Sequence, residues 1–257
     1  MSSSITRSAA AISAAETGAF FLRAVWATLA TYLIGYPLTA VGVLLGCAAA
    51  LVGWRAFVRT GTVVWAYIIF FLIGRVIRVR GRAPTAGTHY LIVANHSSML
   101  DIPALMAAVP GIAIMGRDYL TRIPVFGLLL KILHYVPIDT SSGRSARGAL
   151  EQAALTVRQG IPLGIFPEGT RTETGMVQPL KRGFVHVLRA SGADLLPVSI
   201  SGTFALKPKG KLHMNPRAPI EVTIGTPVAH ASLVSLSDEE IMARVKSILQ
   251  RMGRETA

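Results

Sequence analysis

The stretch "HYLIVANHSSMLDIPALMAA" (residues 89–108) decides how the rest of the chain is interpreted. Its first six residues form a short apolar run typical of a buried strand, and residues 98–108 have the pattern of a helix. Polar residues occupy the turn between the two. In α/β proteins, functional loops lie at this position, at the carboxyl end of a strand. The stretch therefore predicts a strand–turn–helix unit whose turn carries function.

Two side chains of this turn, His96 and Asp101, have two interpretations. A neutral imidazole takes a proton from an alcohol near neutral pH, and a carboxylate on its other nitrogen stabilises the resulting imidazolium. Residues five apart on a helix do not share a face, so this pairing requires the turn to bend back. Alternatively, residues 98–101 form a capping box in which Asp101 serves only the helix N-terminus. The residues alone leave both interpretations open.

The chain after residue 76 continues this alternation of short apolar runs and longer amphipathic runs. The expected strands are residues 76–81, 89–94, 112–116, 163–166, 195–200 and 220–224. The expected helices are residues 98–108, 124–134, 144–159, 181–191 and 238–252. The last helix begins with a capping box formed by Ser237 and Glu240. The pattern is typical of an α/β fold with a mixed, largely parallel sheet flanked by helices.

The N-terminal part has a different texture. Residues 2–15 are small and polar, and we expect them to be poorly ordered. No charged residue occurs from 24 to 54. As a helix this segment would be about 46 Å long, which exceeds the thickness of a membrane's hydrocarbon core, about 30 Å. The sequence "GYP" (35–37) predicts a kink in this run, and a second uncharged run covers residues 60–74. We expect a hydrophobic helical hairpin that anchors the chain to a membrane.

Arginines decide between two forms of this anchor. Two complete spans would place Arg55 and Arg59 in an outer loop, against the tendency of positive residues to remain inside. A hairpin that dips into one leaflet, or a single span followed by an interfacial helix, keeps more arginines on the cytoplasmic side. A buried pair of soluble helices is the alternative. We therefore divide the chain into residues 1–80, the tail and membrane anchor, and residues 81–257, the α/β catalytic domain.

Composition supports a membrane surface as a partner. Hydrophobic residues make up 51% of the chain and charged residues only 15%, whereas a soluble domain is usually about a quarter charged. Lys and Arg outnumber Asp and Glu by 26 to 13, a balance that attracts anionic headgroups and acidic substrates. Without zinc-finger spacing or a block of basic residues, nucleic acid is not an expected partner. The single cysteine, Cys47, excludes an intramolecular disulfide.

Two further polar turns follow strands. In "IFPEGTR" (165–171), Arg171 beside exposed backbone amides forms a natural cradle for a phosphate, and Lys181 follows ten residues later. An ordinary turn with a surface Glu168–Arg171 ion pair is the alternative. In "GRDYLTRIPVFG" (116–127), Arg117 follows a strand and is either a ligand or a solvated arginine. The loop "KPKGK" (207–211) is assigned no catalytic role, and the histidines have no metal-ligand spacing.

Four blocks occur in a characteristic order: "NHSSMLD" (95–101), "RIPVFG" (122–127), "FPEGTR" (166–171) and "LLPVSI" (195–200). In this order and spacing they resemble the glycerolipid acyltransferase family, above all its bacterial 1-acylglycerol-3-phosphate acyltransferases. The resemblance covers roughly residues 76–230. Members of this family also carry N-terminal hydrophobic helices that dock on the membrane.

The resemblance implies a role for each matched position. His96 matches the general base that deprotonates the acceptor hydroxyl, and Asp101 matches its paired carboxylate. No acyl-enzyme intermediate, cofactor or metal is implied; acyl-CoA or acyl-acyl carrier protein serves as co-substrate. The expected acceptor-binding residues are those of the third block, together with basic residues outside it: Arg117, Glu168, Gly169, Thr170, Arg171 and Lys181. Pro197 falls in a block associated with the acyl donor or with site architecture.

The implied activity is transfer of a fatty acyl chain to the free hydroxyl of 1-acylglycerol-3-phosphate, which gives phosphatidic acid for phospholipid biosynthesis. The implied location is the cytoplasmic membrane, with the catalytic domain on its cytoplasmic side. One departure concerns the headgroup, because the family's Ile-Asp-Arg is Ile138-Asp139-Thr140 here. A lyso-ornithine lipid or lysophosphatidylethanolamine is the alternative acceptor. A non-enzymatic basic lipid-binding protein is the alternative of a different class.

Overall fold

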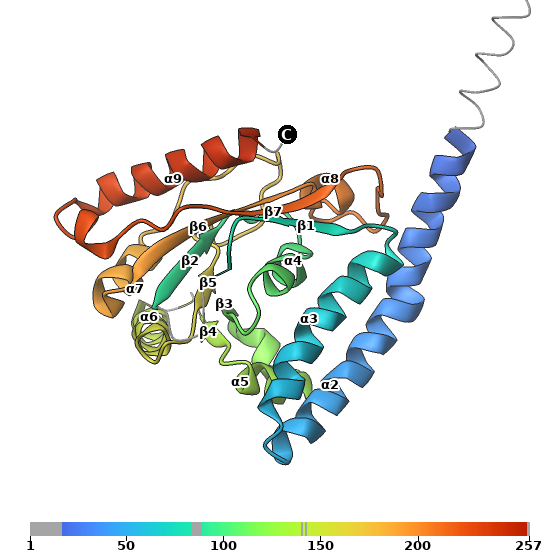
Figure 1. Cartoon of the computed structure of the whole chain (residues 1–257), viewed down its shortest axis with the longest axis horizontal. Coiled ribbons are helices and arrows are strands. Elements are labelled where there is room, and N and C mark those ends of the chain that lie inside the picture. Colours follow the sequence, from blue (N-terminus) through green and yellow to red (C-terminus); the bar gives the residue numbers. More distant parts are fainter. Residues whose placement is uncertain (1–16, 84–88, 140, 142, 256–257) are drawn as a thin grey trace, which may run out of the picture.

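The computed structural model describes residues 17–83, 89–139, 141 and 143–255, and Figure 1 shows their arrangement. Two expectations from the sequence lie outside these described residues. They are the polar tail at residues 2–15 and the departure at Thr140.

A seven-stranded sheet forms the centre of the molecule (Figure 1). Its strand order is β1-β7-β6-β2-β5-β3-β4, and every neighbouring pair is parallel except β6–β7, which is antiparallel. The bounds are β1 Ile77–Arg80, β2 Tyr90–Ala94, β3 Ala113–Arg117, β4 Val136–Ile138, β5 Leu163–Ile165, β6 Asp194–Ser201 and β7 Ile220–Ile224. The predicted fold class, α/β with a mixed and largely parallel sheet, is confirmed.

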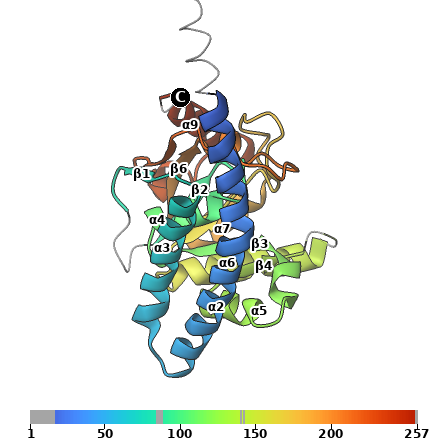
Figure 2. The ribbon, with the colours of Figure 1, turned by 90° about the vertical axis from the view of Figure 1, so that its right-hand side faces the viewer.

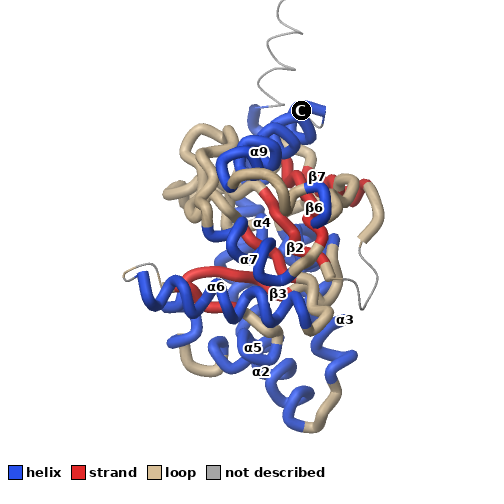
Figure 3. The backbone as a smooth tube through the Cα atoms, turned by 90° about the vertical axis from the view of Figure 1, so that its left-hand side faces the viewer, coloured by secondary structure: helices blue, strands red, loops and turns tan. Residues whose placement is uncertain are grey.

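Helices cover both faces of this sheet. Helices α3 (Arg55–Leu72) and α4 (Asp101–Ala108) share one apolar core with the sheet. Helices α6 (Gly143–Arg158), α7 (Gly183–Ser191) and α9 (Asp238–Glu255) share the core on the opposite face. Figure 2 looks onto the first group and Figure 3 onto the second. Strands between two helical layers are buried on both sides, which explains why β2 is an uninterrupted apolar run.

Several element boundaries differ from the predicted ones. The strand β4 was not predicted, because its three residues alternate too briefly to give a signal. Helix α5 is shorter than predicted, Phe126–Ile132, because Pro124 and the positive φ of Val125 precede it and the positive φ of His134 follows it. The short helix α8 (Thr203–Leu206) and the 3₁₀ turns η2 (Asp118–Arg122) and η3 (His230–Ser232) were also not predicted.

The capping box of α9 is confirmed. The backbone N–H of Ser237 donates to the Glu240 carboxylate at 2.7 Å, and the N–H of Glu240 donates to the Ser237 hydroxyl at 3.2 Å. These reciprocal bonds lower the pKa of Glu240 from its ordinary value.

The N-terminal segment is a helical hairpin, as predicted. Its first arm runs from Thr17 to Leu51 and its second is α3; both are long and apolar enough to cross a membrane. Helical backbone continues through the predicted kink at residues 35–37, where a π-helical turn, η1 (Thr31–Gly35), passes into α2 (Tyr36–Leu51). Most of the hairpin's large apolar side chains are exposed.

Part of the hairpin belongs to the domain core. Phe70 and Ile69 of α3 pack with residues of α4 and of the sheet. The following strand β1 forms an edge of the sheet by pairing with β7. The division of the chain into a tail with a membrane anchor (residues 1–80) and a catalytic domain (residues 81–257) stays a prediction.

Candidate active site

His96 and Asp101 lie within hydrogen-bonding distance of each other. The Nδ1 atom of His96 is 2.9 Å from Oδ2 of Asp101. Residues 95–98 form an irregular turn and α4 begins at Asp101 rather than at residue 98, so the chain bends back as the pairing requires. The same oxygen accepts the backbone N–H of Ser98 at 2.7 Å. Only this half of the predicted capping box is present, because the N–H of Asp101 donates to the Ser98 carbonyl and no side chain caps α4 at its N-cap, Leu100. Asp101 therefore holds the preceding turn and His96 rather than capping the helix.

The Asp101 carboxylate is completely buried and surrounded by donors. Its Oδ2 also accepts the backbone N–H of Ser97 at 2.6 Å, and its Oδ1 accepts the Thr203 hydroxyl at 2.5 Å. Because the carboxylate is the acceptor, Nδ1 of His96 carries the proton and Nε2 keeps its lone pair. Within the described part of the chain, no group forms a hydrogen bond to Nε2. The arrangement presents an oriented base at the protein surface.

Two neighbours hold the turn and the imidazole ring in place. The side chain of Asn95 bonds the C=O of Ile200 at 2.9 Å and its N–H at 2.8 Å, which extends the β2–β6 ladder beyond the last paired residues. The ring of Phe166 stacks on the His96 ring with centroids 4.3 Å apart. Backbone and ring are therefore fixed from opposite sides.

Thr203 is a site residue that the sequence analysis missed. It begins α8 immediately after Gly202, whose φ is +81°. A Cβ at Gly202 would lie 1.9 Å from the Pro219 carbonyl oxygen, so only glycine fits there. Its position in the sequence could have identified it, because Thr203 follows the end of β6 by two residues, as His96 follows the end of β2.

Glu168 joins two parts of its own connection to the His96 turn and is buried rather than facing solvent. Its Oε1 accepts the backbone N–H of His96 at 2.7 Å, and its Oε2 accepts the N–H of Gln178 at 2.8 Å. Burial raises the pKa of this carboxyl above its usual value, while the two backbone bonds act in the opposite direction. Both oxygens of Glu168 thus accept backbone N–H groups, which ties the turn after β5 to the His96 turn; its predicted role in acceptor binding stays a prediction.

The other predicted acceptor-binding residues lie around this carboxylate. Gly169 and Thr170 are exposed, and Arg171 is half-buried. A Cβ on Gly169 would be 2.8 Å from Nζ of Lys181, so the lysine side chain crosses the turn. Arg117 is exposed at the end of β3. Among the described residues, Arg117, Arg171 and Lys181 form no ion pair.

Lys207 is a second residue that the sequence analysis missed, since it was assigned to a solvated loop. It is buried, and its ammonium donates to the Lys211 carbonyl. Its own carbonyl accepts the Ser98 hydroxyl at 2.8 Å, which ties this loop to the start of α4. Burial lowers the pKa of Lys207, and the positive charge of Arg171 lowers it further. Lys207 therefore adds a second positive charge near Arg171 at this edge.

These residues meet because four parallel strands end at one edge of the sheet. His96, Glu168, Arg117 and Thr203 lie at or just beyond the carboxyl ends of β2, β5, β3 and β6. This edge is the usual ligand site of open α/β sheets. In the described part of the chain, no group of three His, Cys, Asp or Glu residues is arranged to hold a metal ion.

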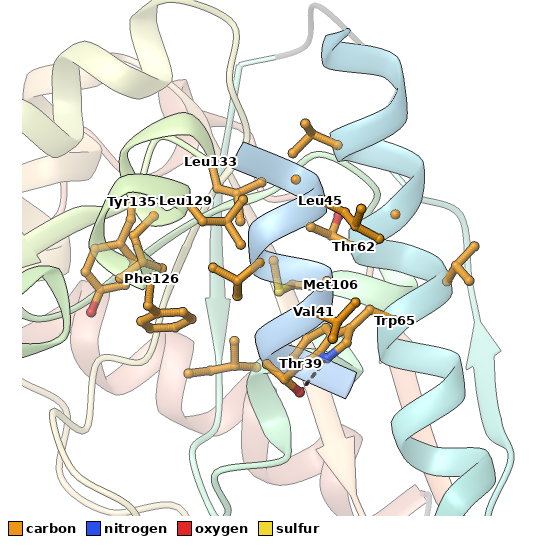
Figure 4. A pocket seen from close by; sticks show the side chains of 18 of the residues that line it. Thr39, Val41, Leu45, Thr62, Trp65, Met106, Phe126, Leu129, Leu133 and Tyr135 are labelled. Atoms are coloured by element: carbon orange, nitrogen blue, oxygen red, sulfur yellow. Dashed lines mark hydrogen bonds between the residues drawn. The ribbon is translucent and has the colours of Figure 1, made fainter. Parts of the chain in front are cut away.

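An apolar cavity of about 350 Å³ lies between the hairpin and the sheet (Figure 4). Its walls come from α2 and α3 on one side and from α4, β3 and α5 on the other. Among the lining residues are Val41, Trp65, Met106, Phe126, Leu129 and Tyr135. Ile102, which follows Asp101 in α4, also lines it. Helix α4 therefore contributes to both the cavity wall and the polar turn, although no residue of that turn is among those that line the cavity.

Comparison with known proteins places this site in a family. The sequence profile of the family described as "Acyltransferase" matches residues 76–201, which include all four blocks. A solved structure, the 1-acyl-sn-glycerophosphate (LPA) acyltransferase PlsC of Thermotoga maritima, superposes with a TM-score of 0.77. It is 27% identical, and the match covers 91% of this chain and 96% of that one.

The chain belongs to the acyltransferase family.

Curated relatives agree with this family membership. The 1-acyl-sn-glycerol-3-phosphate acyltransferase of Cocos nucifera is 29% identical over 163 residues, 63% of this chain and 52% of that protein. The protein of the same name from Borreliella burgdorferi is 31% identical over 118 residues, 45% of this chain and 47% of that protein. This acyltransferase-family chain spans about half the length of the curated relatives it matches.

Proposed function

We propose that this acyltransferase-family protein transfers a fatty acyl chain from an acyl thioester to the free hydroxyl of 1-acylglycerol-3-phosphate, giving phosphatidic acid. The observation that carries the proposal is the His96 imidazole held at 2.9 Å by a fully buried Asp101 at the ligand edge of the sheet. The printed names of the relatives and of the matching structure supply the substrate class.

The reaction needs one base and no nucleophilic side chain. Nε2 of His96 takes the proton of the acceptor hydroxyl as its oxygen attacks the thioester carbonyl carbon. Asp101 stabilises the imidazolium through the Nδ1–H bond. The tetrahedral intermediate collapses with cleavage of the C–S bond, and the imidazolium returns the proton to the departing thiolate. The products are the ester and a free thiol, so atoms and charges balance.

Cations at the same edge fit the phosphate of the acceptor. Arg171 provides a fork that suits a phosphate, and Lys181 crosses the adjacent turn. The buried Lys207 adds a charge beside Arg171, and Arg117 extends the positive edge along the sheet. Ligand binding would relieve the repulsion between Arg171 and Lys207.

The apolar cavity fits a fatty acyl chain, because its lining is almost entirely hydrocarbon and it shares helix α4 with the polar turn. The hairpin that forms one wall would dock into the leaflet that holds the lysolipid. In this arrangement the catalytic domain lies on the cytoplasmic side of the cytoplasmic membrane, where acyl-CoA or acyl carrier protein delivers the chain.

The test uses the full-length protein in nanodiscs. We expect release of free thiol from a long-chain acyl-CoA only when lysophosphatidic acid is added, and loss of kcat by a factor of roughly 10² to 10⁴ in His96→Ala. His186→Ala, which removes an exposed histidine from α7, is the matched control and should keep full activity.

An acceptor panel separates the alternatives. Activity with lyso-ornithine lipid or lysophosphatidylethanolamine instead of lysophosphatidic acid would show that the acceptor carries that other headgroup. If no acceptor gives transfer with either donor type while lipid binding persists, the protein would be a non-enzymatic lipid-binding protein.

A further inference from the structure

A second apolar surface lies outside the hairpin. It consists of Tyr119, Ile123, Val125 and Leu128 in η2, in the following turn and at the start of α5, and we call it the η2–α5 surface. These side chains are 57%, 44%, 44% and 49% exposed. Four large apolar side chains within ten residues exceed the single exposed residues that are normal on a soluble protein.

The η2–α5 surface continues the exposed apolar surface of the hairpin. Helix α5 packs directly on α2: the Sγ of Cys47 is 3.7 Å from the Val125 carbonyl oxygen, and a Cβ on Gly46 would be 3.1 Å from Leu129. Figure 1 shows α5 beside the lower part of the hairpin, close to its connection. The residues around that connection are also exposed and apolar: Leu51, Val52 and Trp54.

Val125 gives a separate reason to look outside the chain for a partner. Its backbone has φ +63° and ψ −49°, which is a steric outlier for a β-branched residue. Val125 is the central residue of a γ-turn closed by the N–H of Phe126 on the Pro124 carbonyl at 2.6 Å, and the close approach of Gly127 to the Thr121 carbonyl permits this turn. Glycine would adopt this conformation at lower cost. The strained and half-exposed valine side chain is not explained by packing within the protein.

Basic side chains border the apolar residues. Arg122 and Lys131 are exposed on η2 and α5, and Arg55 and Arg59 are exposed at the start of α3. Arg122 also pairs with Asp118, the single acidic residue of η2 and α5. An apolar patch with a positive rim is complementary to the acyl region and the anionic headgroups of a lipid leaflet.

We infer that the η2–α5 surface is a second membrane-docking surface, which enters the same leaflet as the hairpin. Two contacts on either side of the cavity fix the orientation of the domain, so that the cavity opens toward the lipid. This docking concerns the lipid surface alone and holds whichever acceptor the enzyme uses.

Site-specific fluorescence tests the inference directly, because Cys47 is the only cysteine. In a Cys47→Ala background, Leu128→Cys is labelled with an environment-sensitive dye and mixed with vesicles of phosphatidylcholine and phosphatidylglycerol in equal parts. Leu155→Cys on α6 is the matched control, since Leu155 is 47% exposed and lies on the opposite layer. Leu51→Cys reports on the hairpin.

We expect a blue shift at positions 128 and 51, quenching at both by lipids that carry a nitroxide on the acyl chain, and no change at position 155. A dye at position 128 that stays in water while position 51 enters lipid would overturn the inference. Failure of both positions to enter lipid would overturn it together with the membrane anchor, and activity in detergent would still test the acyltransferase separately.

A second variant avoids the dye. Val125→Gly with Leu128→Ser should weaken vesicle binding by about tenfold or more, because two apolar side chains leave the lipid. The melting temperature should change little, since glycine adopts the positive φ at position 125 without steric strain. Unchanged vesicle binding in a folded double variant would contradict the inference, and Leu155→Ser should bind as the original chain does.

Discussion

The two halves of the ligand edge are built in opposite ways. Around Asp101, each carboxylate oxygen has at least one donor at 2.9 Å or less, and the group is closed to water. Around Arg171, the neighbouring cations have no carboxylate partner in the described part of the chain, and Lys207 lies close enough for its pKa to be lowered. The hydrogen bonds around Asp101 are therefore complete without a ligand, whereas the positive charges around Arg171 are not balanced by negative ones.

This difference predicts different kinetic roles. A completed hydrogen-bond network holds the base in one geometry before the substrate arrives, so its loss should lower kcat. An unbalanced positive region is neutralised by the bound acceptor, so its loss should raise the acceptor KM. Each substitution below tests whether the edge divides in this way.

The largest effect is expected for Asp101→Asn. The amide cannot accept the N–H groups of Ser97 and Ser98, the Nδ1–H of His96 and the Thr203 hydroxyl together, so the imidazole loses its tautomer and orientation. We expect kcat to fall by a factor of roughly 10² to 10⁴ with little change in the acceptor KM, measured by thiol release. A melting curve identifies the folded fraction, and a rise in KM without loss of kcat would contradict the division.

Arg171→Ala tests the other region. Loss of a charge-assisted bond to phosphate should raise the acceptor KM by about 10- to 100-fold and lower kcat much less. The matched control is Arg182→Ala, because Arg182 is exposed and already paired with Asp238 and Glu239 of α9. If the two variants behave alike, Arg171 is an ordinary surface residue and the anion site lies elsewhere.

The order of elements was predictable because apolar runs in a parallel sheet are long and continuous. The strands at β2, β6 and β7 and the helices at α6, α7 and α9 all lie within a few residues of the expected ranges. Strand β4 and helix α8 were not predictable, because three or four residues give no periodic signal and both depend on tertiary pairing. Sequence alone also did not show that α3 packs into the core.

The site was predictable where function and local sequence coincide, and not where residues meet across the sheet. His96 and Asp101 share one turn, so both were found. Thr203 reaches Asp101 from 102 positions away, and Lys207 reaches the start of α4 through its carbonyl. Glu168 was placed in the right loop, but residue type alone did not indicate its two bonds to backbone N–H groups.

A smaller effect is expected for Thr203→Val, which removes one donor to Asp101 and keeps the side-chain volume. A single hydrogen bond to a charged group contributes about 1.5 to 3 kcal/mol. Because the other donors still stabilise the Asp101 carboxylate, we expect the lower end of this range, and kcat should fall by roughly tenfold. Thr203→Ser keeps the hydroxyl and should restore most of the activity. A drop confined to the acceptor KM would place Thr203 with the cations instead of with the base.

The smallest effect at neutral pH is expected for Lys207→Met, and its sign depends on pH. Below its lowered pKa, the ammonium attracts the acceptor phosphate; as pH rises through that pKa, the attraction is lost, so kcat/KM for the acceptor should fall on the alkaline side. Lys207→Met should lack this alkaline limb, and Lys207→Arg should move it to higher pH.

Stability gives the independent readout. A cation whose folded-state pKa is lowered destabilises the folded protein below that pKa, and the penalty disappears above the ordinary lysine value. Lys207→Met should therefore melt at the same or a higher temperature at neutral pH, even though the acceptor KM rises. If Lys207 is purely structural, Lys207→Met should give the reverse, a lower melting temperature with an unchanged acceptor KM. Lys207 would then belong with the hydrogen-bonded region around Asp101.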